Sequence, residues 1–258
     1  MSSFSQGWIR SSKIRRHILL SGISKLLGSF LKFIYDFMVQ AFPNEPESIS
    51  FFALSIIIAT VIIRVAVLPV NISMMKNQKK MAELQPEIEK LQRKYKNDPQ
   101  TLAVKQQKLY KEANYNIFAG CLPMIIQMVV LIAFYRVFLE PAKYAFTDKA
   151  FFESINKNFF YLKNLEFKDT TMILPAMAGI TTFITSYLSS KNPANQGNQQ
   201  ANSMMKSMTI MMPLLIFWMS RNFQAGLALY WVVGNIVSII QQLITNAIIA
   251  KDVSEEVK

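Results

Sequence analysis

One arginine stands inside a long apolar segment of this chain. Arg64 lies in residues 49–70, ISFFALSIIIATVIIRVAVLPV, whose other side chains carry no charge. The segment has about 22 residues, the length that a helix needs to cross a bilayer. A charge in such a helix is costly and usually faces water, a cavity or a partner, which makes Arg64 a candidate functional residue. The alternative is structural, because a long side chain six residues before the end of the segment can reach the headgroups.

The sequence offers few groups for enzymatic or metal chemistry. His17 is the only histidine and Cys121 the only cysteine among the 258 residues. A Ser–His dyad and an HExxH zinc site both need histidine inside the helices, and an internal disulfide needs a second cysteine. We therefore expect no catalytic residue, no metal site, no cofactor and no enzymatic activity.

Apolar residues gather in five blocks separated by polar connections. Hydrophobic residues make up 52% of the chain, and this arrangement is typical of a polytopic membrane protein. Helices satisfy their own backbone hydrogen bonds in lipid, and a barrel is not built from apolar runs of about 20 residues. The sequence therefore predicts an all-α polytopic membrane protein with five transmembrane helices, placed at about 49–70, 118–139, 172–190, 204–221 and 226–250.

Residues 22–42 are long enough to span a bilayer but carry a polar stripe. Its members are spaced by 4, 3, 4 and 4 residues, so they share one face of a helix: Lys25, Ser29, Lys32, Asp36 and Gln40. We predict an N-terminal interfacial helix that lies along the membrane, followed by a break at Pro43 and Pro46. The first twenty residues lack an apolar core with a cleavage site, so we expect no signal peptide.

The connection between the first two blocks is long, basic and helical in pattern. Residues 71–117 hold ten Lys/Arg and five Asp/Glu. An apolar stripe, a turn signal at Asn97–Pro99 and a second helical segment predict a helical hairpin over residues 72–115. The alternative is a solvated hairpin without a partner. We place the hairpin and the C-terminus in the cytoplasm, which leaves the basic N-terminal tail outside, against the charge rule.

Polar side chains lie inside several predicted spans. Thr60 is one turn before Arg64, Gln127 stands alone in an apolar run, and one seam on the last span contains Trp231, Asn235, Ser238, Gln242 and Thr245. Such residues often only join helices by hydrogen bonds. No Asp or Glu lies well inside any span, so we expect Arg64 to be solvated by water and neutral polar groups in a hydrated groove. The same absence argues against proton-coupled transport.

Several sequence motifs resemble those of one membrane protein family. They are Arg64 followed by VLPV, ELQPEIEKLQRKYKNDPQ in the hairpin, GCLPMIIQ at residues 120–127 and GLALYWVVGNIVSIIQQ at residues 226–242. In order and over about residues 49–250, the chain is similar to YidC/Oxa/Alb-type membrane protein insertases, in the five-span form of Gram-positive bacteria.

The resemblance implies a function and a set of site residues. Members of the family admit nascent membrane proteins into a positively charged groove, open to the cytoplasm and to lipid, and release them into the bilayer. The match places Arg64, Thr60, Gln127, Trp231 and Asn235 at this groove. It implies partners among nascent membrane proteins, membrane lipids, the ribosome and the Sec translocon, and no DNA. The tail KDVSEEVK is short and mixed in charge, so we expect no ribosome docking through it.

These observations lead to one function hypothesis and two alternatives. We expect an insertase and chaperone in the plasma membrane of a bacterium, with the N-terminus outside. Its parts are a tail with the interfacial helix (1–48), a five-helix core (49–250) and a short C-terminal tail (251–258). The alternatives are a small transporter or anion channel that uses Arg64 as the binding charge, and a scaffold whose hairpin docks partners.

Overall fold

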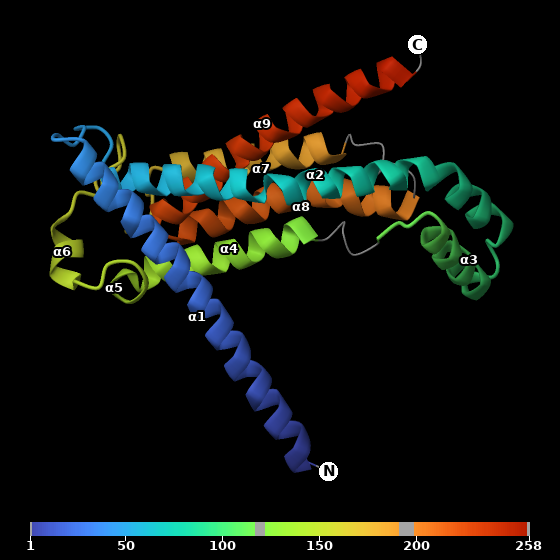
Figure 1. Ribbon diagram of the computed structural model, residues 1–258, viewed down its shortest axis with the longest axis horizontal. Helices are drawn as coiled ribbons and strands as arrows, with labels where there is room; N and C mark the ends of the chain where they lie inside the picture. Colours follow the sequence, from blue (N-terminus) through green and yellow to red (C-terminus); the bar gives the residue numbers. More distant parts are fainter. Residues whose placement is uncertain (1, 117–121, 191–198, 257–258) are drawn as a thin grey trace. The chain divides into compact units, whose positions relative to one another are not determined.

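Helices form the regular structure throughout the described part of the chain. The structure is a computed structural model that describes residues 2–116, 122–190 and 199–256 (Figure 1). The predicted all-α fold is confirmed there. The helices are α1 (Ser2–Ala41), α2 (Phe51–Lys94), α3 (Pro99–Glu112), α4 (Leu122–Leu139), α5 (Pro141–Tyr144), α6 (Lys149–Ser154), α7 (Ile173–Ser190), α8 (Gln199–Asn222) and α9 (Ala225–Glu256).

Three of the described helices are long and apolar enough to cross a membrane. They are α2, α7 and the Ala225–Thr245 part of α9. The apolar part of α4, Ile125–Leu139, is shorter, and residues 118–121 of the predicted second span lie outside the described residues. α8 covers the predicted fourth span but is not among the three. The predicted count of five spans therefore stays a prediction.

The helix that contains the first predicted span continues beyond residue 70. α2 continues to Lys94 and contains Pro69 and Pro86. The sequence between these prolines has no glycine and no turn cluster, so nothing there stops the helix. Pro69 lies in the apolar part of α2, and prolines are tolerated inside membrane helices. The turn comes at residues 95–98, where Asp98 caps α3 by accepting a hydrogen bond from the Thr101 N–H at 3.0 Å. The hairpin itself remains a prediction.

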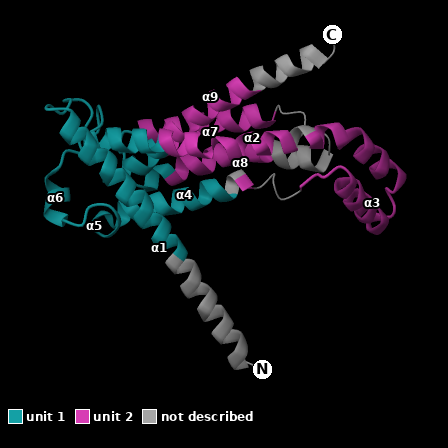
Figure 2. Cartoon of the chain, viewed as in Figure 1, with its two compact units in different colours: residues 1–60, 124–172, 220–230 teal, residues 61–123, 173–219, 231–258 magenta. Residues whose placement is uncertain are grey.

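The chain forms two compact units (Figure 2). Unit 1 comprises residues 1–60, 124–172 and 220–230, and unit 2 comprises residues 61–123, 173–219 and 231–258. The predicted segments 1–48, 49–250 and 251–258 divide the chain along its sequence. They are a different kind of division, and they too stay a prediction.

In unit 1, helix α1 has three distinct faces. One face is buried and includes Ser24, Gly28, Leu31 and Tyr35. At Gly28 a side chain would meet the carbonyl oxygen of Tyr144 at 2.1 Å, so only glycine allows this approach of α1 to α5. The predicted polar stripe is exposed or half-buried. A third face exposes apolar side chains, namely Leu19, Leu26, Phe33 and Phe37.

Aromatic side chains fill the core of unit 1. Phe52 packs against the rings of Phe138, Phe146 and Phe152 at centroid distances between 5.8 and 6.3 Å. Three aromatic residues of the 141–171 connection belong to this core, since Tyr144, Phe146 and Phe152 are only 5%, 0% and 3% exposed.

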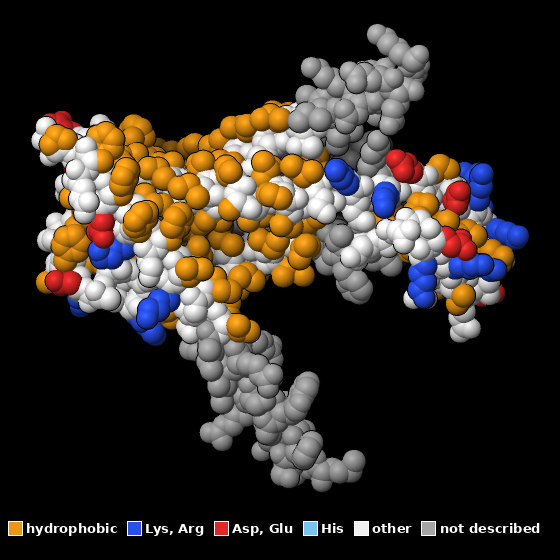
Figure 3. Space-filling view, viewed as in Figure 1, with side chains coloured by type: hydrophobic (Ala, Val, Ile, Leu, Met, Phe, Trp, Pro, Cys, Tyr) orange, Lys and Arg blue, Asp and Glu red, His pale blue; other side chains and the backbone are white. Residues whose placement is uncertain are grey.

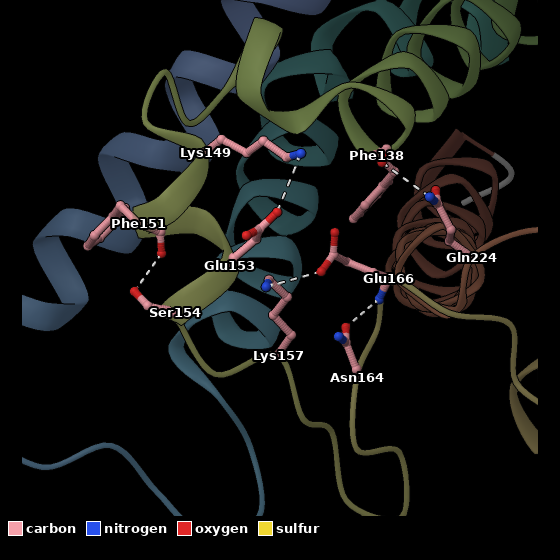
Figure 4. A network of polar contacts seen from close by, with 9 residues as sticks. All are labelled: Phe138, Lys149, Phe151, Glu153, Ser154, Lys157, Asn164, Glu166 and Gln224. Atoms are coloured by element: carbon pink, nitrogen blue, oxygen red, sulfur yellow. Dashed lines mark hydrogen bonds and ion pairs between the residues drawn. The ribbon is translucent and has the colours of Figure 1, made fainter.

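A loop in unit 1 carries a buried cation (Figure 4). Lys157 is 5% exposed, and its Nζ lies 3.0 Å from Oε2 of Glu166 and 4.3 Å from the centroid of the Phe152 ring. The same loop binds the start of two helices. The Asn158 carbonyl accepts hydrogen bonds from the backbone N–H and hydroxyl of Ser50 at 3.0 and 2.8 Å, and the Leu165 carbonyl accepts from the Gly226 N–H at 2.9 Å.

Unit 2 combines apolar helices with a basic extension. At Gly179 of α7 a side chain would lie 3.2 Å from Cβ of Phe217 in α8, so a small residue allows these helices to approach closely. α8 exposes a broad apolar surface that includes Ile210, Met211, Leu214, Leu215 and Trp218. Lys and Arg side chains gather instead over α3 and the C-terminal end of α2 (Figure 3).

Candidate functional site

Arg64 of α2 lies against α9 at a glycine. A Cβ placed on Gly234 would lie 2.7 Å from Nη2 of Arg64, 3.2 Å from Nε and 3.3 Å from Cζ. Three atoms of the guanidinium group therefore pass directly over the Gly234 backbone. Arg64 is only half-buried, so its charge sits between an apolar helix surface and a more accessible side.

A second contact fixes the backbone of α2 at the same residue. Nε2 of Gln241 donates a hydrogen bond to the carbonyl oxygen of Arg64 at 3.2 Å. Gly234 and Gln241 are seven residues apart, two turns of α9, and so they share one face of that helix. The Arg64 backbone and its side chain are thus each in contact with α9.

Trp231 and Asn235 of α9 bind threonine hydroxyls of α7. Nε1 of Trp231 donates to Oγ1 of Thr182 at 2.9 Å. Nδ2 of Asn235 donates to Oγ1 of Thr182 at 2.9 Å and to Oγ1 of Thr181 at 3.1 Å. Asn235, Thr181 and Thr182 are all buried, at 7%, 8% and 6% exposure. These bonds satisfy polar groups that would otherwise be costly in an apolar environment.

The amide of Asn235 has donors and acceptors on both sides of the contact with the two threonines. Oγ1 of Thr182 donates to the Ala178 carbonyl at 2.6 Å, and Oγ1 of Thr181 donates to the Met177 carbonyl at 2.8 Å. Each hydroxyl has one proton, so what remains for Asn235 is a lone pair. In the opposite amide orientation the oxygen faces the same hydroxyls and also the Nε1–H of Trp231 at 3.2 Å, a group that can only donate. Asn235 therefore contacts both threonines in either orientation of its amide.

The other two predicted site residues belong to unit 1. Thr60 is 1% exposed, and its hydroxyl donates to the Ile56 carbonyl of its own helix at 2.6 Å. Nε2 of Gln127 donates to Oη of Tyr230 at 3.3 Å. Tyr230 in turn stacks on Phe134, with ring centroids 4.5 Å apart. Thr60 and Gln127 thus have local partners within unit 1, and their place at a common groove stays a prediction.

Sequence reasoning identified the polar residues of unit 2 but not all of their neighbours. The resemblance places Arg64, Trp231 and Asn235 at one groove with Thr60 and Gln127, and the hydrogen bonds of Trp231 and Asn235 join α9 to α7. Gly234 and Gln241, which contact Arg64, were not singled out. The sequence does carry a signal for Gly234, because a small residue in an apolar helix often marks a point where another helix approaches closely.

Arg64 in unit 2 can provide a positive charge for binding, but it is not itself a reacting group. A guanidinium carries five N–H donors and keeps its charge at any physiological pH. In surroundings less polar than water, the charge acts on other charged groups over several ångströms. It can bind or attract an anionic group, and no bond-breaking step follows from it.

Comparison with known proteins agrees with the family resemblance of the sequence motifs. The family described as 60Kd inner membrane protein matches residues 46–252. A membrane protein insertase YidC of Clostridium perfringens is 38% identical over 191 residues, 74% of this chain and 76% of that protein. The protein of the same name from Clostridium tetani is 35% identical over 227 residues, 88% of this chain and 94% of that protein. The membrane protein insertase MisCA of Bacillus subtilis is 37% identical over 194 residues, which cover 74% and 68% of the two chains.

The region matched contains every predicted site residue, from Thr60 to Asn235. It also contains the apolar helices α2, α7 and α9 and the residues that contact Arg64. The chain therefore belongs to the 60Kd inner membrane protein family, the YidC/Oxa/Alb family that its motifs resemble.

Proposed function

We propose that this protein is a membrane protein insertase that receives nascent membrane proteins at Arg64 and releases them into the bilayer. The observation that carries the proposal is the position of Arg64, a permanent charge in an apolar helix, held against α9 at Gly234 and Gln241. The relatives named membrane protein insertase YidC support the substrate class.

The proposed mechanism is electrostatic. Arg64 attracts acidic side chains in the short tail of a substrate and so lowers the free energy of moving that tail part-way across the membrane. At an effective dielectric near 20, a carboxylate at about 4 Å gains on the order of 4 kcal/mol. The apolar segment of the substrate then partitions into lipid, which is favourable on its own. No ATP is needed for either step.

A hydrated groove on the cytoplasmic side completes the proposal. In unit 2 its wall would include Arg64, Trp231 and Asn235, whose polar groups could exchange contacts with a substrate tail. α7, α8 and α9 expose apolar surfaces that fit contact with lipid tails. In lipid, unlike in water, such surfaces carry no free-energy cost. On this basis α4 and α8 are the two further spans of a five-span protein.

The N-terminal helix is proposed to lie on the outer membrane surface. Its polar stripe and its exposed apolar face are neighbours on α1, while the third face packs within unit 1. A helix with such faces lies in the interface, with apolar side chains in the acyl region. The N-terminus would then be outside, and the basic hairpin with the C-terminus would be in the cytoplasm of a bacterium, where the ribosome and the Sec translocon are available partners.

Paired substrates test the electrostatic step. Two single-span substrates that differ only in tail acidity would be inserted by wild type, Arg64→Lys and Arg64→Ala in proteoliposomes with matched protein levels. We expect Arg64→Lys to retain much of the activity, because the ammonium keeps the charge. Arg64→Ala should lose about tenfold or more with the acidic tail and little with the neutral tail.

Two results would contradict this mechanism. Equal loss with both substrates in Arg64→Ala would leave Arg64 a structural role. Loss in Arg64→Lys equal to that in Arg64→Ala would point to the planar five-donor fork instead of the charge. Flux of small anions through the same proteoliposomes, abolished by Arg64→Ala, would favour an anion channel.

A further inference from the structure

Gly234 stands where the guanidinium of Arg64 crosses α9. The 2.7 Å separation between a Cβ at this position and Nη2 of Arg64 is shorter than real Cβ contacts allow. The Nε and Cζ atoms, at 3.2 and 3.3 Å, are also close. No side chain larger than hydrogen fits at residue 234 while Arg64 keeps this position.

We propose that Gly234 is a positioning residue that sets where the Arg64 charge stands, with Gln241 as its second anchor. The inference rests on the proposed function, since it assigns a role in the insertion step. It concerns a residue that makes no contact with substrate in this scheme. Its effect is exerted through the location of the guanidinium group alone.

The backbone contact makes the side chain the part that must move. Gln241 holds the Arg64 carbonyl at 3.2 Å, which ties α2 to α9 at the level of the backbone. The clash at residue 234 involves the far end of a flexible side chain. A methyl group there therefore turns the guanidinium away, by a rotation about its side-chain bonds, and leaves the two helices in place.

The helix itself has no need of glycine at residue 234. The structure finds no positive-φ glycine among the residues it describes, so Gly234 does not serve an unusual backbone conformation. Alanine is a better helix former than glycine by roughly 1 kcal/mol in water. A loss of function in Gly234→Ala would therefore come from the displaced charge and not from a weakened helix.

The experiment uses the full-length protein and the paired substrates described above. We expect Gly234→Ala to lower insertion of the acidic-tail substrate by about tenfold, the effect of moving a charge by a few ångströms, and to leave the neutral-tail substrate unchanged. Lysine lacks the Nη2 branch that makes the 2.7 Å contact. In the Gly234→Ala/Arg64→Lys double variant the ratio of acidic to neutral insertion should return to that of Arg64→Lys alone.

A matched glycine in another helix of unit 2 provides the control. Gly179→Ala makes the same chemical change, but its new methyl group lies 3.2 Å from Cβ of Phe217 and involves no charge. It should lower insertion of both substrates alike, if at all, and Arg64→Lys should not rescue it. Gly22→Ala, with no atom within 4 Å of the added carbon, should behave as wild type.

The outcomes separate this inference from the proposed function. If Arg64→Ala shows the acidic-tail defect and Gly234→Ala keeps the wild-type ratio, Gly234 is not a positioning residue although the function stands. An equal loss for both substrates in Gly234→Ala, without rescue by Arg64→Lys, would also overturn it in favour of general packing. If Arg64→Ala shows no selectivity, the proposed function fails first.

Discussion

The two units of this protein hold a positive charge in opposite ways. In unit 1 the ammonium of Lys157 lies between a carboxylate and an aromatic ring, 3.0 Å from Glu166 and 4.3 Å from the ring centroid of Phe152, and is 5% exposed. In unit 2 the guanidinium of Arg64 crosses Gly234 of α9, and the side chain is half-buried.

The difference separates a buried charge that joins parts of the fold from a half-buried one that another molecule can approach. The carboxylate next to Lys157 neutralises it, so little field remains beyond the pair. Arg64 is half-buried, so an acidic substrate tail can approach its charge, which the proposed attraction requires. Two glycines differ in a similar way. Gly28 lies against backbone atoms of Tyr144, whereas Gly234 lies against the end of the Arg64 side chain.

Gly28→Ala should have the largest effect on stability. The added carbon would lie 2.1 Å from the carbonyl oxygen of Tyr144 and 2.5 Å from its carbonyl carbon. Backbone atoms cannot rotate away, so α1 must shift from α5, at a cost of about 3 kcal/mol in free energy of unfolding. Thermal unfolding in detergent would measure the loss.

Gly22→Ala is the control for this prediction. It lies on the same helix, and nothing stands within 4 Å of the added carbon. Its unfolding temperature should equal or slightly exceed that of wild type, since alanine favours the helix. Equal unfolding temperatures for the two variants would show that α1 does not pack closely at Gly28.

Lys157→Met should destabilise the protein by about 2 kcal/mol. Removing one partner of a buried pair leaves the other charge uncompensated, and we reduce the expected cost because Glu166 is 28% exposed and can reach water. Adding Glu166→Gln should restore part of the loss. Substrate selectivity should be unchanged, the reverse of the expected result for Arg64→Ala.

An exposed pair in the same region tests whether burial is the cause. Lys149 and Glu153 are 3.6 Å apart with 78% and 65% of their side chains exposed. Lys149→Met should therefore leave the unfolding temperature within error of wild type, as is usual for surface pairs. If it destabilises as much as Lys157→Met, the burial of Lys157 is not what makes its ion pair important.

The sequence was sufficient for the helices but not for either charge environment. Runs of apolar residues placed α7 and the start of α9 within one residue of their observed positions, because length and hydrophobicity decide membrane helices. Arg64 was evident as a charge in such a run. Lys157 was not, because its partner lies nine residues away in an irregular loop whose path no periodicity reveals. Gly234 has no functional group, so its role becomes apparent only from its contact with Arg64.

Thr182→Val should cost about 1 kcal/mol in the free energy of unfolding. The hydroxyl accepts hydrogen bonds from Trp231 and Asn235, both at 2.9 Å, and side-chain bonds between membrane helices have values of this order or less. Valine keeps the shape but removes the acceptor. The emission of Trp231 should also shift, which a variant with all tryptophans except Trp231 replaced by phenylalanine would resolve.

Thr185→Val is the matched control on α7. Its hydroxyl donates to the Thr181 carbonyl of its own helix at 2.8 Å, so valine removes a bond within α7 and none to α9. Its unfolding temperature and tryptophan emission should remain at wild-type values. If Thr182→Val is equally silent, the bonds from α9 to α7 contribute nothing measurable to unit 2.

The smallest expected effect is at Asp98, the exposed N-cap of α3. Hydrogen bonds from the Thr101 side chain and then from its backbone N–H lower the pKa of the Asp98 carboxyl. The folded pKa is below the unfolded value of about 3.9, so the contribution to α3 is complete above about pH 4 and is lost as pH falls through the folded pKa. Amide-exchange protection of α3 should decline over that range. In Asp98→Asn, whose amide oxygen still caps the helix without titrating, the decline should be absent. An unchanged decline in that variant would assign it to carboxylates other than Asp98.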